Sequence, residues 1–200
     1  IRTLTSLSQG GLMLTFFYSP GSSSMAPHIA LHEIGAPFEA KSLALSKKEQ
    51  KNADYLAMNP EGKVPLLLVD GRPLTEVAGI MFYLAKAFPQ AKLMPDDAEG
   101  QGHVVSWTSY AASTLHPARK AGLDVAKECF ARADKRLAGR DWCVGTFSIA
   151  DIHLFRLFWK FVDYAQAQRE DYPNLFAHYD RMMARPSVRK TIELESKQEA

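Results

Sequence analysis

The chain is 200 residues long, with 46% hydrophobic residues, 23% charged residues and a formal net charge of +2 at pH 7. This length allows one large domain or two small ones with a substantial core, and the composition is that of an ordinary globular protein. A charge so close to zero gives no sign of a nucleic-acid or anionic membrane partner. No apolar run approaches the ~20 residues that span a bilayer.

Cysteine usage points to a reducing compartment. The two cysteines, Cys129 and Cys143, are too few for a disulfide framework, and neither stands in a CxxC or His-rich setting. We therefore expect a cytoplasmic protein with no bound metal.

The first twelve residues are rich in Ser, Thr and Gly and contain no sustained apolar stretch. A secretory signal would need about 7–15 consecutive apolar residues before its cleavage site. We expect residues 1–12 to be a disordered extension or one added by cloning, with Met13 as the natural start.

The next part of the chain predicts alternating strands and helices. Asp70-Gly71 lies between apolar runs, which is typical of a hairpin turn, and Gly35 is placed to end a helix. The expected elements are a strand at 14–18, a helix at 25–34, a strand at 38–45, a helix at 47–57, a strand at 66–69, a return strand closing at Leu74 and a helix from 77 to 88. This order predicts a thioredoxin-like domain over residues 13–88.

Residues 89–97 carry two prolines and few helix signals, so we interpret them as a linker. Beyond the linker the pattern is helical throughout. Ser148-x-x-Asp151 has the spacing of a capping box. The sequence predicts an all-helical domain over residues 98–200, with helices at about 98–117, 121–138, 148–166, 173–184 and 186–194.

Two loops could hold a ligand. Pro65 stands at the first residue of a buried strand, where a proline removes no needed ladder donor, and the residues alone do not decide whether its bond is cis. Glu76 stands at the start of the following helix. In the other loop, a serine cluster between the first strand and first helix suits an anion, because backbone N–H groups and the positive helix end converge there. The alternative is that a serine simply caps this helix.

These motifs together resemble a known family. Asn59-Pro60-x-Gly62-x-Val64-Pro65 followed by Leu74-Thr75-Glu76 resembles the glutathione-binding half of the glutathione transferases. The stretch from Tyr18 to Leu31, with Trp142-Cys143-x-Gly145 and Phe147-Ser148-x-Ala150-Asp151, is similar to the bacterial beta class. The resemblance covers nearly the whole chain from Met13.

The resemblance implies a glutathione site. A cis-proline at Pro65 would expose the backbone of Val64 to the cysteinyl part of glutathione, and Glu76 with Val77 would hold the γ-glutamyl end. Val77 stands where the family usually has a serine. Lys48 and Lys63 match positions near the glycyl carboxylate, although most lysines are solvated surface charges.

The resemblance also implies four candidates for stabilising the glutathione thiolate, which are Ser23, Ser22, Tyr18 and His116. Ser23 stands where the beta class has a cysteine, so it cannot form that class's mixed disulfides. Its hydroxyl can still donate to a thiolate, as serines do in other classes. For Tyr18 the alternative role is packing in the core.

An electrophile pocket is implied at Trp107, Tyr110 and Ala111, which the resemblance places in the first helix of the second domain. Helix packing is the alternative, since Trp107 and Tyr110 lie three residues apart on one helical face.

The expected protein is a homodimeric glutathione transferase that conjugates the thiolate of glutathione to small hydrophobic electrophiles, with peroxidase activity as a side reaction. Glutathione would be its co-substrate. Two alternatives stay open. One is a zeta-type glutathione-dependent isomerase, since Ser22-Ser23-Ser24 partly matches that class's serine-rich motif. The other is a non-catalytic glutathione-binding or protein-interaction member of the superfamily.

Overall fold

The computed structural model describes residues 12–197, and the expected extension at 1–12 therefore falls outside it except for Leu12. The first half alternates strands and short helices in the order expected of a thioredoxin-like domain. Its elements are β1 (Leu14–Tyr18), α1 (Met25–Ile34), β2 (Glu39–Ser42), α2 (Ala53–Met58), β3 (Leu66–Val69), β4 (Arg72–Thr75) and α3 (Val77–Ala87).

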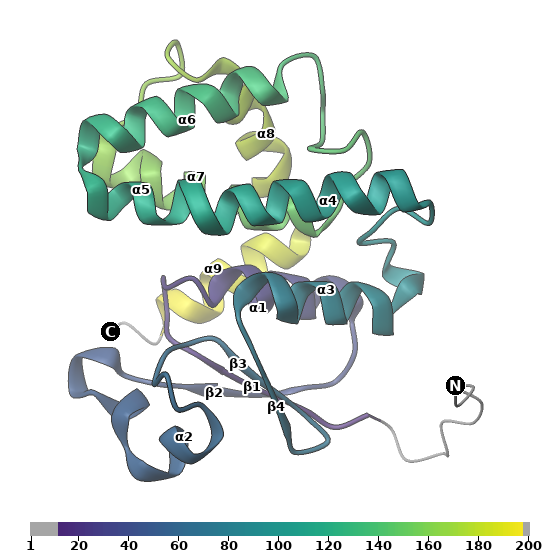
Figure 1. The fold of residues 1–200 in the computed structure, drawn as a ribbon, viewed down its shortest axis with the longest axis vertical. Helices are drawn as coiled ribbons and strands as arrows, with labels where there is room; N and C mark the ends of the chain where they lie inside the picture. The colour runs from purple at the N-terminus through teal and green to yellow at the C-terminus, as the bar shows by residue number, and fades with distance from the viewer. Residues whose placement is uncertain (1–11, 198–200) are drawn as a thin grey trace.

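The four strands form one sheet in the order β2-β1-β3-β4. β1 pairs in parallel with β2 and antiparallel with β3, and β3 pairs antiparallel with β4. Asp70 and Gly71 both have positive φ, as the predicted tight hairpin turn requires, and Val69 pairs with Arg72 across it. α1 and α3 cover the sheet face that is turned toward the second half of the chain (Figure 1).

The segment between β2 and α2 differs from the expected strand and helix. The strand is only four residues long, and two 3₁₀ turns, Leu45–Lys47 and Glu49–Lys51, precede α2. Lys48 between them has a φ of +59°, which ends any α-helix at that point. The Glu49 carboxylate accepts a hydrogen bond from the Ala44 N–H at 2.7 Å and holds this tighter path.

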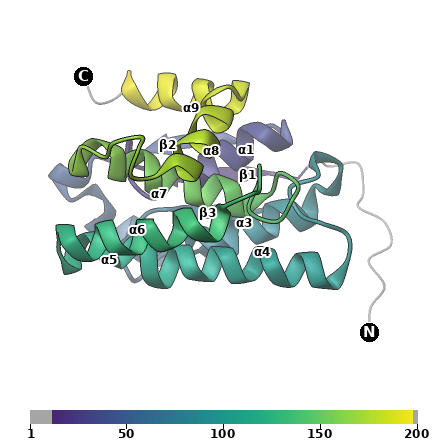
Figure 2. The ribbon, with the colours of Figure 1, turned by 90° about the horizontal axis from the view of Figure 1, so that it is seen from above.

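The second half is helical, as predicted. After a 3₁₀ turn at Pro89–Ala91, its helices are α4 (Ala98–Tyr110), α5 (His116–Ala121), α6 (Leu123–Leu137), α7 (Ile149–Ala165), α8 (Pro173–Met183) and α9 (Pro186–Ser196). α4, α5 and α6 run together along one side of this half, and α9 lies along the opposite side (Figure 2). No helix within residues 12–197 is long and apolar enough to cross a bilayer.

The helix expected over 98–117 is built in three parts. A π-helical turn, Ala111–Leu115, separates α4 from α5, and Gly122, with a φ of +126°, separates α5 from α6. A π turn changes which side chains share a face, because its hydrogen bonds run to the fifth residue along. The residues after Tyr110 therefore face differently from those of an unbroken α-helix.

The predicted capping box at the start of α7 is confirmed. The Asp151 Oδ2 accepts hydrogen bonds from the Ser148 N–H (2.9 Å) and hydroxyl (3.0 Å). Its Oδ1 accepts from the Cys143 N–H at 2.7 Å and lies 3.1 Å from His178 Nε2. Cys143, Asp151 and His178 form a cluster with metal-binding atom types, but both carboxylate oxygens of Asp151 already have hydrogen-bond partners in the protein.

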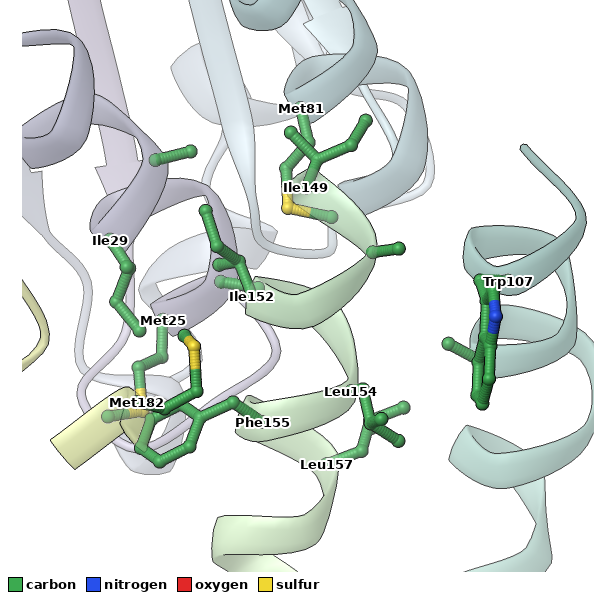
Figure 3. Packing of buried hydrophobic residues seen from close by; sticks show 14 of the residues in the cluster. Met25, Ile29, Met81, Trp107, Ile149, Ile152, Leu154, Phe155, Leu157 and Met182 are labelled. Carbon is green, nitrogen blue, oxygen red and sulfur yellow. The ribbon is translucent and has the colours of Figure 1, made fainter. Parts of the chain in front are cut away.

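One hydrophobic core joins the two halves. Figure 3 shows the contact, in which Met25 and Ile29 of α1 and Met81 of α3 face Ile149, Ile152 and Phe155 of α7. Burying a side chain of this size stabilises the fold by about 1.5–3 kcal/mol. Because the two halves share this core, the expected domain limits at residues 88 and 98 stay a prediction.

A polar contact also joins the two halves at the other end of α1. The Glu33 carboxylate accepts two hydrogen bonds from the Arg185 guanidinium, at 2.7 and 2.9 Å, and a third from the Ser187 hydroxyl. Burial alone would raise the pKa of Glu33, but these hydrogen bonds lower it below its ordinary value of 4.5. The carboxylate is thereby kept ionised where α1 meets the start of α9.

Candidate functional site

A cleft separates the loops of the first domain from α5 and α7 of the second. It has a wide half of about 730 Å³ and a narrow half of about 420 Å³. Five residues line both halves, so the two halves adjoin as parts of one cleft. These residues are Ser23, Lys63, Val64, His116 and Lys120. Of the sequence-predicted residues, Pro65, Glu76 and Val77 line the narrow half, and Ser22 lines the wide half.

The loop before α1 presents the Ser23 hydroxyl to the cleft. Ser24 is fully buried, and its hydroxyl donates to the Ser19 carbonyl (3.0 Å) while accepting from the Ser19 N–H (3.1 Å). The Ser22 hydroxyl lies 2.6 Å from that of Ser24 and accepts from its N–H. Ser23 is the middle residue of this hydrogen-bonded turn, and its hydroxyl forms no hydrogen bond within residues 12–197. It is the serine left to bind a ligand.

The second domain holds this loop in place. The Arg156 guanidinium on α7 donates to the carbonyls of Gly21 and Ser22, both at 2.9 Å. Glu195 on α9 accepts from the Gly21 N–H (2.9 Å) and lies 2.8 Å from His28 Nδ1. Burial lowers the pKa of Arg156 to about 10, and it still carries its charge at neutral pH.

The hairpin side of the cleft is held by backbone contacts. The Val64-Pro65 peptide bond is cis, which the residues alone had left open. The carbonyl of Lys63 accepts hydrogen bonds from the Tyr55 hydroxyl (2.6 Å) and the Asn59 amide (2.8 Å). These contacts fix the chain just before the cis bond, so the Val64 backbone has a defined position beside the cleft.

The start of α3 forms another wall of the narrow half. Thr75, Glu76, Val77 and Ala78 all line it. Glu76 has a φ of +66° and a ψ of 129°, a backbone conformation that non-glycine residues adopt rarely. The free N–H groups and positive dipole end of this eleven-residue helix favour a negatively charged group there.

Two histidines close the narrow half from the second domain. Burial lowers the pKa of His116, and the nearby charges of Arg156, Lys120 and Arg119 lower it further. His153 on α7 is 2% exposed, and its Nδ1 has no hydrogen-bond partner among the described residues. Burial lowers the pKa of His153 to about 3, so this ring is neutral at physiological pH.

Tyr18 lines neither half of the cleft, and its expected role near the thiol stays a prediction. Its ring is stacked on Phe16 at 5.8 Å and lies 4.7 Å from the ring of His28. Side chains alternate along a strand, so Tyr18 shares with Phe16 the face of β1 that packs under α1. Lys48 also lies outside, on the exposed 3₁₀ segment, and lines neither half of the cleft.

Trp107, Tyr110 and Ala111 do not line the cleft either. The Arg136 guanidinium lies 4.1 Å from the ring centre of Trp107 and 5.2 Å from that of Tyr110, and the Tyr110 hydroxyl donates to the Cys129 carbonyl at 3.1 Å. These side chains therefore pack against α6, which was the alternative reading. Ala111 is buried. The expectation that these three residues form an electrophile pocket stays a prediction.

The sequence analysis missed most of the second-domain lining. The omitted polar and aromatic residues of the two halves are Gln50, Asn59, Glu61, Thr75, Arg119, Lys120, Phe130, His153, Arg156, Lys160 and Tyr164. Helical spacing carried a usable signal. Arg119 and Lys120 follow His116 by three and four residues, and Lys160 follows Arg156 by four, so each set shares a helix face.

The first half of the chain has a thioredoxin-like fold, and the second half is an all-α domain. A cleft lies between the two. Family comparison agrees along most of the chain. Residues 13–86 match the glutathione S-transferase N-terminal domain, and residues 83–186 match the glutathione S-transferase C-terminal domain. The chain belongs to the glutathione S-transferase family.

Similar proteins come from several bacteria. Glutathione S-transferase GstA of Escherichia coli O157:H7 is 34% identical to this chain, and the match covers 91% of this chain and 98% of the GstA sequence. A sphingomonad glutathione S-transferase complexed with glutathione is 34% identical with a TM-score of 0.82, over 91% of this chain and 98% of its own. The beta-class enzyme of Sphingomonas chungbukensis is also 34% identical with a TM-score of 0.82, over 90% and 98%.

Proposed function

We propose that the narrow half of the cleft binds glutathione and that the protein transfers its thiolate to an electrophile in the wide half. The proposal rests on one observation, that Ser23, the cis Val64-Pro65 bond and the start of α3 line the same cleft. The Val64 backbone would pair with the cysteinyl part of glutathione. Glu76 and the Val77 N–H would hold the γ-glutamyl end.

Lys63 supplies the cation for the glycyl carboxylate. It lines both halves of the cleft and lies beside the cis bond, whereas Lys48 lines neither. The side chain of Lys63 is 71% exposed and lies 3.3 Å from Glu61, so it is free to turn toward a ligand. We leave Lys48 out of the proposed site for this reason.

The chemistry requires a stabilised thiolate. A free thiol has a pKa near 8.5, so only a few per cent is ionised at pH 7. Lowering that pKa by about two units requires roughly 2.7 kcal/mol of preference for the anion. A hydrogen bond from Ser23, the positive end of α1 and the cations of the cleft together supply this much. The thiolate then attacks carbon, a C–S bond forms, and the leaving group departs with its electron pair.

Among the other candidates, the Ser22 hydroxyl is engaged with Ser24, and His116 is the one that also lines both halves of the cleft with Ser23. The lowered pKa of His116 leaves it neutral at physiological pH. A neutral imidazole can donate one hydrogen bond but adds no charge to the thiolate. We therefore assign the main role to the Ser23 hydroxyl.

The test is Ser23→Ala, with Ser22→Ala as the matched control on the same loop. Losing a hydrogen bond to an anion costs about 1.5–3 kcal/mol, so Ser23→Ala should slow turnover of a chlorinated nitroaromatic about ten- to a hundredfold. It should also raise the pKa of bound glutathione, read from thiolate absorbance. Ser22→Ala should change both much less. Equal effects of the two variants, or loss only in His116→Ala, would contradict the assignment.

Two further measurements separate the rival functions. Ser23→Cys should form a mixed disulfide with glutathione under oxidising conditions, seen as added mass, which the natural chain should not form. Retention on glutathione–agarose without turnover of any electrophile would instead favour a non-catalytic binding protein.

We propose that the protein is a homodimer. Two large apolar side chains, Phe82 on α3 and Val105 on α4, are 42% and 45% exposed and come from the two different domains. Single exposed apolar side chains are normal on monomers, so the proposal rests on the dimer that the family resemblance implies. Sedimentation at micromolar concentration should show twice the mass of the 22.3 kDa chain, and a species of 22.3 kDa would reject the dimer.

A further inference from the structure

The wide half of the cleft is strongly basic. Five of its lining residues are cations, and none of the described residues that line it is Asp or Glu; the cations are Lys63, Arg119, Lys120, Arg156 and Lys160. The whole chain has a formal net charge of only +2, so this is a local concentration of charge. The walls between the cations are apolar and aromatic, from Leu45, Leu115, Phe130, Leu157 and Tyr164.

Several of these cations have no structural task in the protein. Arg156 is committed to the loop carbonyls, and Lys63 is assigned to glutathione. Neither Arg119 nor Lys120 forms an ion pair with any residue in 12–197, and Lys160 reaches only Asp163, at 3.6 Å on the same helix. The Arg119 guanidinium lies 5.3 Å from the ring centre of Tyr164, which sets it against an apolar wall.

The positive charge of this region acts on its neighbours. Besides burial, the pKa of His116 is lowered by Arg156, Lys120 and Arg119 together. The same positive potential would stabilise an anion placed among these groups. A cleft lined by one sign of charge also raises the local concentration of oppositely charged ligands.

We propose that the electrophile taken by the wide half is itself an anion, with an aromatic or aliphatic body and a carboxylate or sulfonate group. This inference rests on the proposed transferase function. The apolar body packs against Phe130 and Tyr164, and Arg119 and Lys160 hold the anionic group. The reaction is unchanged by that group: thiolate sulfur bonds to the carbon that bears the leaving group, and the leaving group departs as an anion.

The rival explanation is that all these cations serve glutathione. Its glycyl carboxylate carries one charge, and Lys63 at the junction of the two halves is placed to meet it. Arg119 and Lys160 line the wide half only. They are therefore the residues whose replacement separates the two explanations.

The experiment compares 4-chloro-3,5-dinitrobenzoate with its uncharged carboxamide, each rate being divided by the uncatalysed rate with glutathione. The natural chain should favour the carboxylate, and this preference should decrease as salt rises, because exposed charges are screened. Arg119→Gln and Lys160→Gln should each lower the carboxylate-to-amide ratio of kcat/KM about two- to fivefold. Lys135→Gln, which removes an exposed charge on α6 away from the cleft, should leave the ratio unchanged.

Three results would overturn the proposal. A natural chain that prefers the amide, at any salt concentration, would show that the acceptor need not be anionic, while the transferase function would stand. An equal loss with both acceptors and a higher KM for glutathione in the two variants would assign the cations to glutathione. Turnover of neither acceptor would reject the proposed function and this inference with it.

Discussion

Replacing His153 should change how the stability of the protein depends on pH. This ring is 2% exposed on α7, its Nδ1 has no partner among the described residues, and burial lowers its pKa to about 3 from an ordinary value of 6.5. His116 and Arg156 lower the pKa further through their charges. In the unfolded chain the ring would titrate near 6.5.

Because the pKa of His153 is lower in the folded state, the unfolded chain binds an extra proton as the pH falls below 6.5, and folding loses stability. The contribution is fully present above pH 6.5 and is lost progressively toward pH 3. Between pH 7.5 and pH 5.0 one such group lowers the free energy of unfolding by about 2 kcal/mol.

Urea unfolding at pH 7.5 and pH 5.0 measures the contribution of His153 to the pH dependence of stability. The natural chain is compared with His153→Gln. The variant should be less stable at each pH, because a buried amide replaces the ring, but its loss of stability between pH 7.5 and 5.0 should be about 2 kcal/mol smaller. His32, whose pKa is lowered to about 4, keeps a similar term in both proteins. His103→Gln, at an exposed position on α4, is the control and should keep the full pH dependence. An unchanged pH dependence in His153→Gln would refute the reasoning.

Two further predictions concern contacts between the domains. Arg156→Lys keeps the positive charge, but a lysine cannot donate to the carbonyls of Gly21 and Ser22 at the same time, as the guanidinium does. It should therefore lower the free energy of unfolding by about 1.5–3 kcal/mol and raise the KM for glutathione more than it lowers kcat. An unchanged KM would contradict the role of Arg156 in holding the loop. Glu33→Gln should lower the free energy of unfolding by about 1–3 kcal/mol at pH 7. The pKa of Glu33 is lower in the folded chain than its ordinary value of 4.5, so the stability that the natural chain gains from this carboxylate is lost as the pH falls below about 4.5. The difference between the two proteins should therefore shrink in acid. Chemical denaturation at pH 7 and pH 3.5 checks this, and a difference that stays constant would contradict it.

Local patterns predicted the fold because the physics behind them is local. Asp70-Gly71 forms the turn, and Ser148 with Asp151 starts α7, since both depend on hydrogen bonds and φ values within a few residues. The break at Lys48 could not be predicted in this way. A lysine gives no sequence signal for a positive φ, and the contact from Ala44 to Glu49 that holds the tighter path is visible only in the folded chain.

The predicted site residues divide into those that line the cleft and those that do not. Ser22, Ser23, Lys63, Val64, Pro65, Glu76, Val77 and His116 line it, whereas Tyr18, Lys48, Trp107, Tyr110 and Ala111 do not. Val64-Pro65, Glu76 and Ser23 lie together because loops at one end of a small sheet meet there. Trp107 and Tyr110 contact Arg136 and Cys129 of α6 instead. Helical spacing shows that two side chains share a face, but it does not show which neighbouring helix covers that face. The π turn after Tyr110 also changes the facing of the residues that follow. The basic wide half brings together Arg119 and Lys120 of α5 with Arg156 and Lys160 of α7, which no spacing within one helix reveals.

The contact between Glu195 and the loop that carries Ser23 sets an order of events during synthesis. The Gly21 N–H and His28 find their carboxylate partner 174 and 167 residues further along the chain. At about 5–20 residues per second, a ribosome needs roughly 9 to 34 seconds to add the residues from 24 to 195. During that time the emerging first domain can form its sheet, but the loop lacks the acceptor that fixes it. The protein can acquire its finished cleft only after residue 195 has been synthesised.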